Sequence, residues 1–305
     1  MNNRYIEPKG KKRNNNDVEF LDKTPFVNQV EKSYRVNVLS EPEIIVKKGH
    51  LFLDEKIVIV GVDVIRCATT SCAILAAGGT AVRFYGKRTE LIEKMFVDLD
   101  RYKKMGIPCV TMGEFAGKPI PGGIAANSPR VVSPKLVRGK RILFLTKNLG
   151  DLCCDIIEII EENRHRWLGD FVIGCFFNLE KTVSFIQKSG RRRVVVCCGG
   201  FRKTESLEDL FFTGKLITML RIPERECDDG ALASIAVYEK YRTTIKLREA
   251  IKYCRVSRVL ENFNMIDDVE SSLTGKYINP TILKSMAGVL PTLTWEDRDP
   301  WFKSI

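Results

Sequence analysis

The chain has 305 residues, of which 44% are hydrophobic and 29% charged, which is ordinary for a globular protein with a large core. Its longest apolar run, residues 171–179, is too short to span a bilayer, and no apolar segment follows the first basic residues, so we expect a cytoplasmic protein with neither a membrane span nor a secretory signal. The formal net charge of +11 suits a small anionic substrate as well as nucleic acid, but because the basic run 188–193 resembles a solvated turn, we expect no nucleic-acid partner.

Residues 1–42 are predicted to form a polar, basic N-terminal extension. Five lysine or arginine side chains lie in residues 1–16 against one acid, and asparagine is frequent, so partial disorder is expected. Residues 43–305 are predicted to form a single domain with a helical C-terminal part, because apolar segments recur there and no internal repeat divides them.

Apolar, β-branched segments alternate with amphipathic segments along this domain. The predicted strands are residues 56–65, 79–86, 107–113, 141–146, 170–177 and 192–200. The predicted helices are residues 69–79, 88–106, 151–167, 179–190 and 206–220, followed by two helices within 228–263 and a less regular end. Continuous apolar strands alternating with helices predict an α/β protein with three α/β/α layers and a largely parallel, mixed sheet.

The ten cysteines are predicted to be reduced thiols in the core. None has the Cys-x-x-Cys spacing of zinc or redox sites, and two pairs are adjacent, at 153–154 and 197–198. Most lie inside apolar runs, where a free thiol behaves as a small hydrophobic side chain. A disulfide framework is therefore disfavoured.

The turn after the first strand reads DVIRCATT, residues 63–70. An acid and an arginine at the end of an apolar strand are costly to bury unless they pair or meet a ligand. Arg66 could bind an oxyanion through two hydrogen bonds, and Asp63 could orient it or hold a metal. An equally supported alternative is a structural Asp63–Arg66 pair, with Thr69 or Thr70 capping the next helix.

A second polar turn follows the strand at residues 141–146. Thr146 ends the strand, and Asn148 or Asp151 is expected to cap the next helix. Lys147, if it points into the same crevice as Arg66, would add a second anion-binding charge, because ligands of open α/β sheets gather at the carboxyl ends of strands.

Two further turns carry acids. In residues 197–209 a glycine pair allows a tight turn, Ser206 is expected to cap a helix, and Glu208 or Asp209 is a candidate metal ligand. In residues 227–234 one of two adjacent acids is expected to be an N-cap, although the pair also suits Mg²⁺, which prefers oxygen ligands.

Several reaction classes are disfavoured by missing motifs. The chain has no G-x-x-x-x-G-K-[ST], no G-x-G-x-x-G and no cysteine followed six positions later by arginine. The Asp-x-Asp at residues 98–100 lies in a predicted helix rather than after a strand. With His50 and His165 as the only histidines, histidine chemistry has little support.

The polar turns, in this order, resemble those of the 2-phosphosulfolactate phosphatase family, the ComB-like proteins. The family motifs D-V-x-R-A-T-T, N-S-P, T-x-N-G, G-S-F-x-N, C-A-G…S-L-E-D…G and D-S-A are similar to residues 63–70, 127–129, 146–150, 174–178, 197–214 and 229–231. The resemblance spans about residues 56–270 and implies a ComB-like α/β/α domain.

The resemblance also implies Mg²⁺-dependent hydrolysis of a phosphate ester of a small acidic metabolite, as in the conversion of 2-phospho-3-sulfolactate and water to 3-sulfolactate and phosphate. The implied catalytic residues are Asp63, Arg66, Lys147 and Glu208. The implied substrate-binding residues are Thr69, Thr70, Asn127, Ser128, Asn148, Asn178, Gly199, Gly200 and Arg202, with Lys203 as a further candidate. The implied Mg²⁺ ligands are drawn from Asp63, Glu208, Asp209 and Asp229.

One departure from the family leaves a second function open. Residues 254–260 resemble a late family segment, S-x-H-G-R-x-L, in which Val256 stands at the histidine position. Losing a histidine removes a possible general acid, an effect worth about a hundredfold or more in rate. The alternative is therefore a catalytically impaired family member that binds a ligand or a protein. A homo-oligomer also stays open.

Overall fold

The sheet is built from short strands whose side chains are buried on both faces. The computed structural model describes residues 35–39, 56–115, 118–201, 204–296 and 298–305. Its strands are β1 (Arg35–Leu39), β2 (Ile57–Val62), β3 (Ala81–Tyr85), β4 (Cys109–Phe115), β5 (Lys118–Pro119), β6 (Arg141–Leu145), β7 (Asp170–Gly174), β8 (Arg193–Cys198), β9 (Pro291–Glu296) and β10 (Asp299–Ser304). All six predicted strands are present.

The ten strands are arranged in the order β1-β8-β2-β7-β9-β10-β3-β6-β4-β5. Within β1-β8-β2-β7 and within β3-β6-β4 all pairs are parallel. The antiparallel hairpin β9–β10 lies between these two blocks and pairs with each through a single residue pair, Val172–Thr292 and Phe302–Val82. The sheet is therefore mixed and mostly parallel, as predicted.

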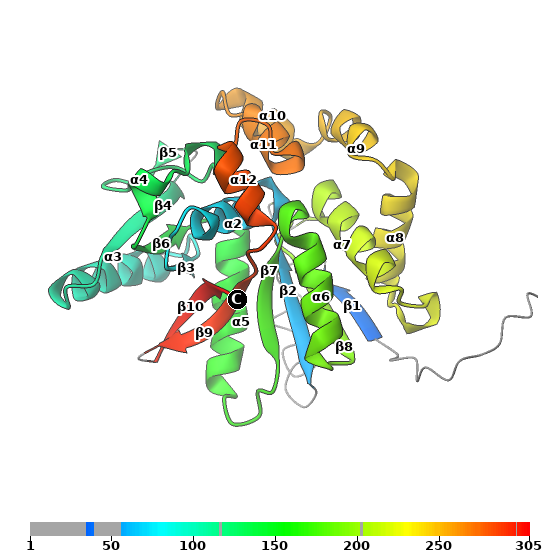
Figure 1. Cartoon of the computed structure of the whole chain (residues 1–305), viewed down its shortest axis with the longest axis horizontal. Coiled ribbons are helices and arrows are strands. Elements are labelled where there is room, and N and C mark those ends of the chain that lie inside the picture. The colour runs from blue at the N-terminus through cyan, green and yellow to red at the C-terminus, as the bar shows by residue number, and fades with distance from the viewer. Residues whose placement is uncertain (1–34, 40–55, 116–117, 202–203, 297) are drawn as a thin grey trace, which may run out of the picture. The chain divides into compact units, whose positions relative to one another are not determined.

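The helices cover both faces of this sheet (Figure 1). They are α2 (Thr69–Ala76), α3 (Thr89–Lys104), α4 (Pro134–Val137), α5 (Asn148–Glu162), α6 (Leu179–Ser189), α7 (Leu207–Leu220), α8 (Asp229–Tyr241), α9 (Thr244–Ile251), α10 (Arg255–Asn262), α11 (Asp267–Thr274) and α12 (Pro280–Met286). The predicted three-layer α/β/α fold is confirmed.

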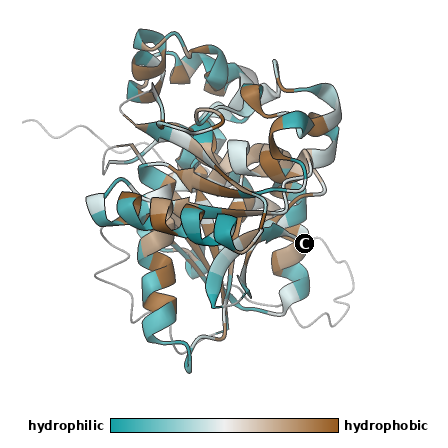
Figure 2. Cartoon of the chain, turned by 90° about the vertical axis from the view of Figure 1, so that its left-hand side faces the viewer, coloured by the Kyte–Doolittle hydropathy of each residue, from teal (hydrophilic) through white to brown (hydrophobic). Residues whose placement is uncertain are grey.

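The alternation of side chains along β2 separates two hydrophobic clusters. Ile57 and Ile59 face a cluster formed with α2, α5 and α12, whereas Val58, Val60 and Val62 face one formed with α6, α7 and α10. Figure 2 shows the matching pattern, with mostly hydrophobic strands and helices that carry hydrophilic residues on their outer side. All ten cysteines are free, and most are buried, as predicted.

Two sequence predictions need correction in the C-terminal part. Residues 228–263 form three helices instead of two, because Arg242 adopts a left-handed conformation that ends α8 and Thr243 caps α9 through its hydroxyl oxygen. The end expected to be less regular contains α11, α12 and the β9–β10 hairpin, which enters the middle of the sheet.

The first described strand bears on the predicted domain boundary. Residues 33–305 form one compact unit, and β1, inside the predicted extension 1–42, pairs in parallel with β8. The folded part thus begins before residue 43. Residues 1–34 and 40–55 lie outside the described residues, so the predicted disorder of the extension stays a prediction. Among the described helices, none has the length and apolar character needed to cross a bilayer.

Candidate functional site

A cavity of about 320 Å³ lies where the carboxyl ends of β2, β4 and β6 meet α10. It collects side chains from three of the four predicted polar turns, those at residues 63–70, 146–150 and 197–209, which are far apart in sequence. Its lining residues are Asp63, Ile65, Arg66, Lys87, Glu114, Asn127, Thr146, Lys147, Asn148, Phe201, Val256, Val259, Leu260, Phe263 and Met265. We call it the polar cavity. The predicted convergence of residues 63–66 with 146–148 is therefore present.

A second cavity, of about 450 Å³, adjoins the first and shares Phe201 and Val256 as lining residues. Glu208, at the start of α7, contributes to its wall. We call it the acidic cavity. The two cavities place Asp63 and Glu208 on either side of a shared apolar boundary.

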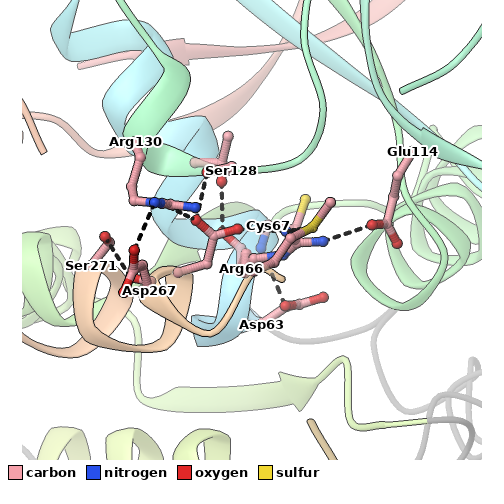
Figure 3. A network of polar contacts seen from close by, with 11 residues as sticks. Asp63, Arg66, Cys67, Glu114, Ser128, Arg130, Asp267 and Ser271 are labelled. Carbon is pink, nitrogen blue, oxygen red and sulfur yellow. Dashed lines mark hydrogen bonds and ion pairs between the residues drawn. The ribbon is translucent and has the colours of Figure 1, made fainter. Parts of the chain in front are cut away.

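Arg66 is buried and bound to two carboxylates (Figure 3). Its Nη2 lies 2.6 Å from Glu114 Oε2, and its Nη1 lies 2.6 Å from Asp268 Oδ2. Because each terminal nitrogen of the guanidinium is bound to a different carboxylate, Arg66 has little charge left for a ligand. Neither predicted role of Arg66 matches this geometry in full: its partners are Glu114 and Asp268, and the structure shows no ion pair with Asp63.

Asp268, in the first turn of α11, is fully buried and accepts three hydrogen bonds. Besides Arg66, the donors are Ser128 Oγ at 2.6 Å and Arg130 Nε at 2.7 Å. Ser128, predicted to bind substrate, thus donates its hydroxyl hydrogen to a buried protein carboxylate. Asp268 thus ties η2 (Val64–Ala68), η3 (Pro129–Val131) and α11 together behind the polar cavity.

Asp63 directly follows β2 and lines the polar cavity with its carboxyl group buried. Burial raises its pKa to about 6, although backbone N–H groups of Cys67 and Leu149 and the charge of Arg66 oppose the shift. Each N–H donates at 3.3 Å, to Oδ1 and Oδ2 respectively. An acid with this pKa exchanges protons near neutral pH.

Glu208 and Asp209 are buried carboxyls in the first turn of α7. Burial raises the pKa of Glu208 to about 7 against a hydrogen bond with Ser206, and it raises the pKa of Asp209 well above its usual value, with the neighbouring acids adding to both shifts. Asp209 accepts hydrogen bonds from the N–H groups of Val64 and Gly200. Glu208 Oε2, in contrast, is buried without a hydrogen-bond partner.

Lys147 is the most accessible cation of the polar cavity. Its side chain is exposed, and it forms no ion pair within the part of the chain that the structure describes. Lys87, which follows β3, lies 3.4 Å from Glu114 Oε1. Asn127 lines the same cavity, and its Oδ1 is buried without a partner. This wall therefore offers a cation and an unsatisfied polar group to a ligand.

Other predicted site residues have local structural contacts. The hydroxyls of Thr69 and Thr70 donate to the carbonyls of Val64 and Arg66, and both side chains are fully buried. Asn178 Oδ1 accepts from the N–H of Cys175, and its Nδ2 donates to a carbonyl in β7. These contacts hold turns in shape. None of the three lines the described cavities.

The glycine pair and the later acids are placed differently. Gly199 N–H donates to the carbonyl of Val62, and Gly200 has a φ of 62°, a left-handed conformation that is consistent with the tight turn that the glycine pair was expected to allow. Asp228 caps α8, which leaves Asp229 exposed and away from both cavities. Arg202 and Lys203 lie outside the described residues.

Two of the predicted helix caps are wrong in detail. Ser206 stands at the N-cap position of α7, but its side chain makes no capping hydrogen bond. Asn148 begins α5 without capping it, and Asp151 accepts from the N–H of Lys87 instead.

The donor set permits only an open Mg²⁺ site. Within the described ranges, no group of three or more His, Cys, Asp or Glu side chains is arranged to hold a metal. Glu208 Oε2 has no hydrogen-bond partner. The charge of Asp63 raises the pKa of Glu208, and the charges of Glu208 and Asp63 raise the pKa of Asp209, so these carboxyls influence one another. Such a group suits an ion bound through one or two carboxylates, water and a substrate phosphate. The exposed Asp229 does not belong to this group.

Sequence reasoning missed Lys87, Glu114, Arg130 and Asp268. Lys87 follows a predicted strand, so the strand-end rule that selected Lys147 also applies to it. Glu114 lies near the end of β4, outside the predicted strand 107–113. Asp268 stands in DDVESS, which resembles an exposed helix start, and its burial depends on packing of α11 against η2.

The fold and the cavity define an α/β/α protein with a cavity at the carboxyl ends of its strands that is lined by both cations and carboxyls. The sequence model of the 2-phosphosulpholactate phosphatase family matches residues 45–282, and the chain belongs to this family. It is 29% identical over 225 residues to a probable 2-phosphosulfolactate phosphatase of Caldanaerobacter subterraneus, with 73% of this chain and 85% of the relative covered.

Two further probable 2-phosphosulfolactate phosphatases are also similar to this chain. The protein of a Cyanothece species is 25% identical over 225 residues, covering 66% of this chain and 86% of its own length. That of Thermosynechococcus vestitus is 28% identical over 190 residues, covering 60% and 71%. The family resemblance inferred from the turns is therefore confirmed, and it supports a phosphatase-like function.

Proposed function

We propose that this protein is a phosphoric monoester hydrolase that acts on a small phosphorylated acid such as 2-phosphosulfolactate. One observation carries the proposal: the polar cavity sets the exposed cation Lys147 and the polar side chains of Asn127 and Asn148 around Asp63, a carboxyl with a pKa of about 6. A phosphate group needs cations and hydrogen-bond donors, and its hydrolysis needs a group that exchanges protons near neutral pH.

The proposed reaction uses Asp63 as its base. Ionised Asp63 accepts a proton from the attacking water, the phosphorus–oxygen ester bond breaks, and the leaving oxygen takes a proton from solvent water. A pKa of about 6 favours this role, because Asp63 is then mostly ionised, and able to accept a proton, at neutral pH. Lys147 and Lys87 would stabilise the negative charge of the transferring phosphate.

Mg²⁺ is part of this proposal. One or two of the carboxylates Glu208, Asp63 and Asp209 would hold it, with water and the substrate phosphate as further ligands, and when bound it would supply Lewis-acid polarisation of the phosphate. Arg66 would act through Glu114 and Asp268 as a positioning residue, since its guanidinium is bound to both. We expect the enzyme to work in the cytoplasm on a small molecule.

The test is release of phosphate from 2-phosphosulfolactate by the full chain, with Mg²⁺ or with EDTA. We expect turnover that EDTA abolishes and that Asp63→Asn lowers by at least about a hundredfold, the usual effect of a general base. The matched control is Asp100→Asn, which changes an exposed acid on α3 and should leave the rate unchanged. No turnover of any phosphate ester would end the proposal, and turnover that survives EDTA would remove Mg²⁺ from it.

The second candidate function is a catalytically impaired binding module. Val256, which stands at the family histidine position, lines both cavities with an apolar side chain, and this observation favours it. Calorimetry with inorganic phosphate would then show binding while the hydrolysis assay shows none.

A further inference from the structure

The polar cavity is lined by apolar as well as charged side chains. Val256, Val259 and Leu260 lie on one side of α10 at positions i, i+3 and i+4, and Phe263 follows at i+7. Ile65, Met265 and Phe201 complete the lining on the apolar side. We call these seven residues the apolar wall.

Part of this wall has no role in the described hydrophobic core. Val256 and Leu260 belong to the cluster on the α6–α7 face of the sheet, so core packing explains them. Val259 and Phe263 belong to none of the three described clusters, although both line the cavity, and Phe263 is 45% exposed. Exposed apolar side chains grouped around a cavity indicate contact with a ligand.

The charges of the cavity are few in comparison. Its described lining contains three cations, Arg66, Lys87 and Lys147, and two carboxyls, Asp63 and Glu114. Arg66 and Lys87 already pair with Glu114. A sulfonate that lay on Val259 and Phe263 would be a charge against apolar side chains, which is costly when it has no partner there.

We infer that the substrate is a phosphorylated 2-hydroxy acid whose third carbon carries an alkyl or aryl group instead of a sulfonate. This inference rests on the proposed hydrolase function and refines its substrate class. The phosphate and carboxylate lie toward Lys147, Lys87 and Asn127, and the apolar group lies on Val259 and Phe263. Hydrolysis breaks the ester bond between phosphorus and oxygen and releases inorganic phosphate and the free 2-hydroxy acid.

The experiment compares two substrates that differ in one group. Phosphate release is measured from 2-phosphosulfolactate and from the 2-phosphate ester of 3-phenyllactate. We expect kcat/KM to be at least about tenfold higher for the phenyl compound, because even one methylene in an apolar pocket changes specificity by about that factor. A preference for the sulfonate, or none, overturns the inference and leaves the hydrolase proposal intact.

Failure of both substrates to turn over would count against the hydrolase proposal, and calorimetry of the same two compounds then tests the inference alone. Tighter binding of the phenyl compound supports it, and equal or weaker binding overturns it. With turnover, Val259→Lys should lower the phenyl-to-sulfonate ratio of kcat/KM at least about tenfold. The matched control is Val97→Lys, at a 66% exposed position on α3 outside both cavities, which should leave the ratio unchanged.

Discussion

Arg66 and Asp268 form a buried ion pair that joins η2 to α11, with 2.6 Å between Nη1 and Oδ2. The pair is part of a larger network, because Asp268 also accepts from Ser128 and Arg130, and Arg66 also binds Glu114. It fixes the turn that carries Asp63 at the edge of the polar cavity. The network therefore supports the site from behind.

We predict that Asp268→Ala is strongly destabilising. Removing this carboxylate leaves Arg66 buried without one of its two partners and frees Arg130, and breaking a buried pair costs about 3–5 kcal/mol. The free energy of unfolding is measured by urea titration. Asp100→Ala, which removes an exposed ion pair with Lys104, is the control and should have no measurable effect. A loss for Asp268→Ala no larger than that of the control would show that the network contributes little.

The sequence predicted the strands and the strand-end turns because both depend on local patterns. Runs such as 56–65 and 192–200 are apolar and β-branched, and Asp63 and Lys147 stand where such runs end. The position of β9–β10 could not be predicted, since strand order depends on packing between segments more than two hundred residues apart, as for Val82 and Phe302.

The ion-pair partners of Arg66 were missed for a related reason. An arginine at a strand end shows that a charge must be neutralised, but it does not say by which acid. Asp268 is 202 residues away, in a segment with no unusual composition. The sequence therefore identified Arg66 as a charge that needs a partner, but only the fold showed that Glu114 and Asp268 are its partners.

Gly150 should tolerate no side chain. It lies in the first turn of α5, and a Cβ there would stand 2.4 Å from the backbone carbonyl oxygen of Tyr85. We expect Gly150→Ala to shift α5 away from β3 and to lower the free energy of unfolding by about 1–3 kcal/mol. The control is Gly288→Ala, whose Cβ would meet its nearest neighbour at 3.6 Å. Equal stability of the two variants in a thermal melt would contradict this account.

Lys147 should contribute to phosphate binding more than Lys87 does. Lys147 is exposed in the cavity wall, whereas Lys87 is already paired with Glu114. We expect Lys147→Met to weaken binding of inorganic phosphate by about tenfold to a hundredfold, the range for a hydrogen bond to a charged group, and Lys87→Met to weaken it less. Calorimetry measures both dissociation constants, and Lys147→Arg should restore most of the affinity. A larger effect at Lys87 would reverse the assignment.

The buried carboxyls Asp63 and Glu208 should make stability fall as the pH rises toward neutrality. In the folded protein the pKa of Asp63 is about 6, against 3.8 for an unperturbed aspartate, so between these values the folded state binds more protons than the unfolded state. Its ionisation then costs about 2–3 kcal/mol by pH 7 and nothing below pH 4.

Asp63→Asn should therefore gain stability relative to the parent protein as the pH rises from about 4 to 7. Glu208→Gln should do the same over a window that extends slightly higher, because the pKa of Glu208 is about 7. Urea titrations across this range measure the difference, and Asp100→Asn, at an exposed position, should give a difference that does not change with pH. A difference for Asp63→Asn that stays flat or falls would mean that Asp63 is ionised in the folded protein without cost.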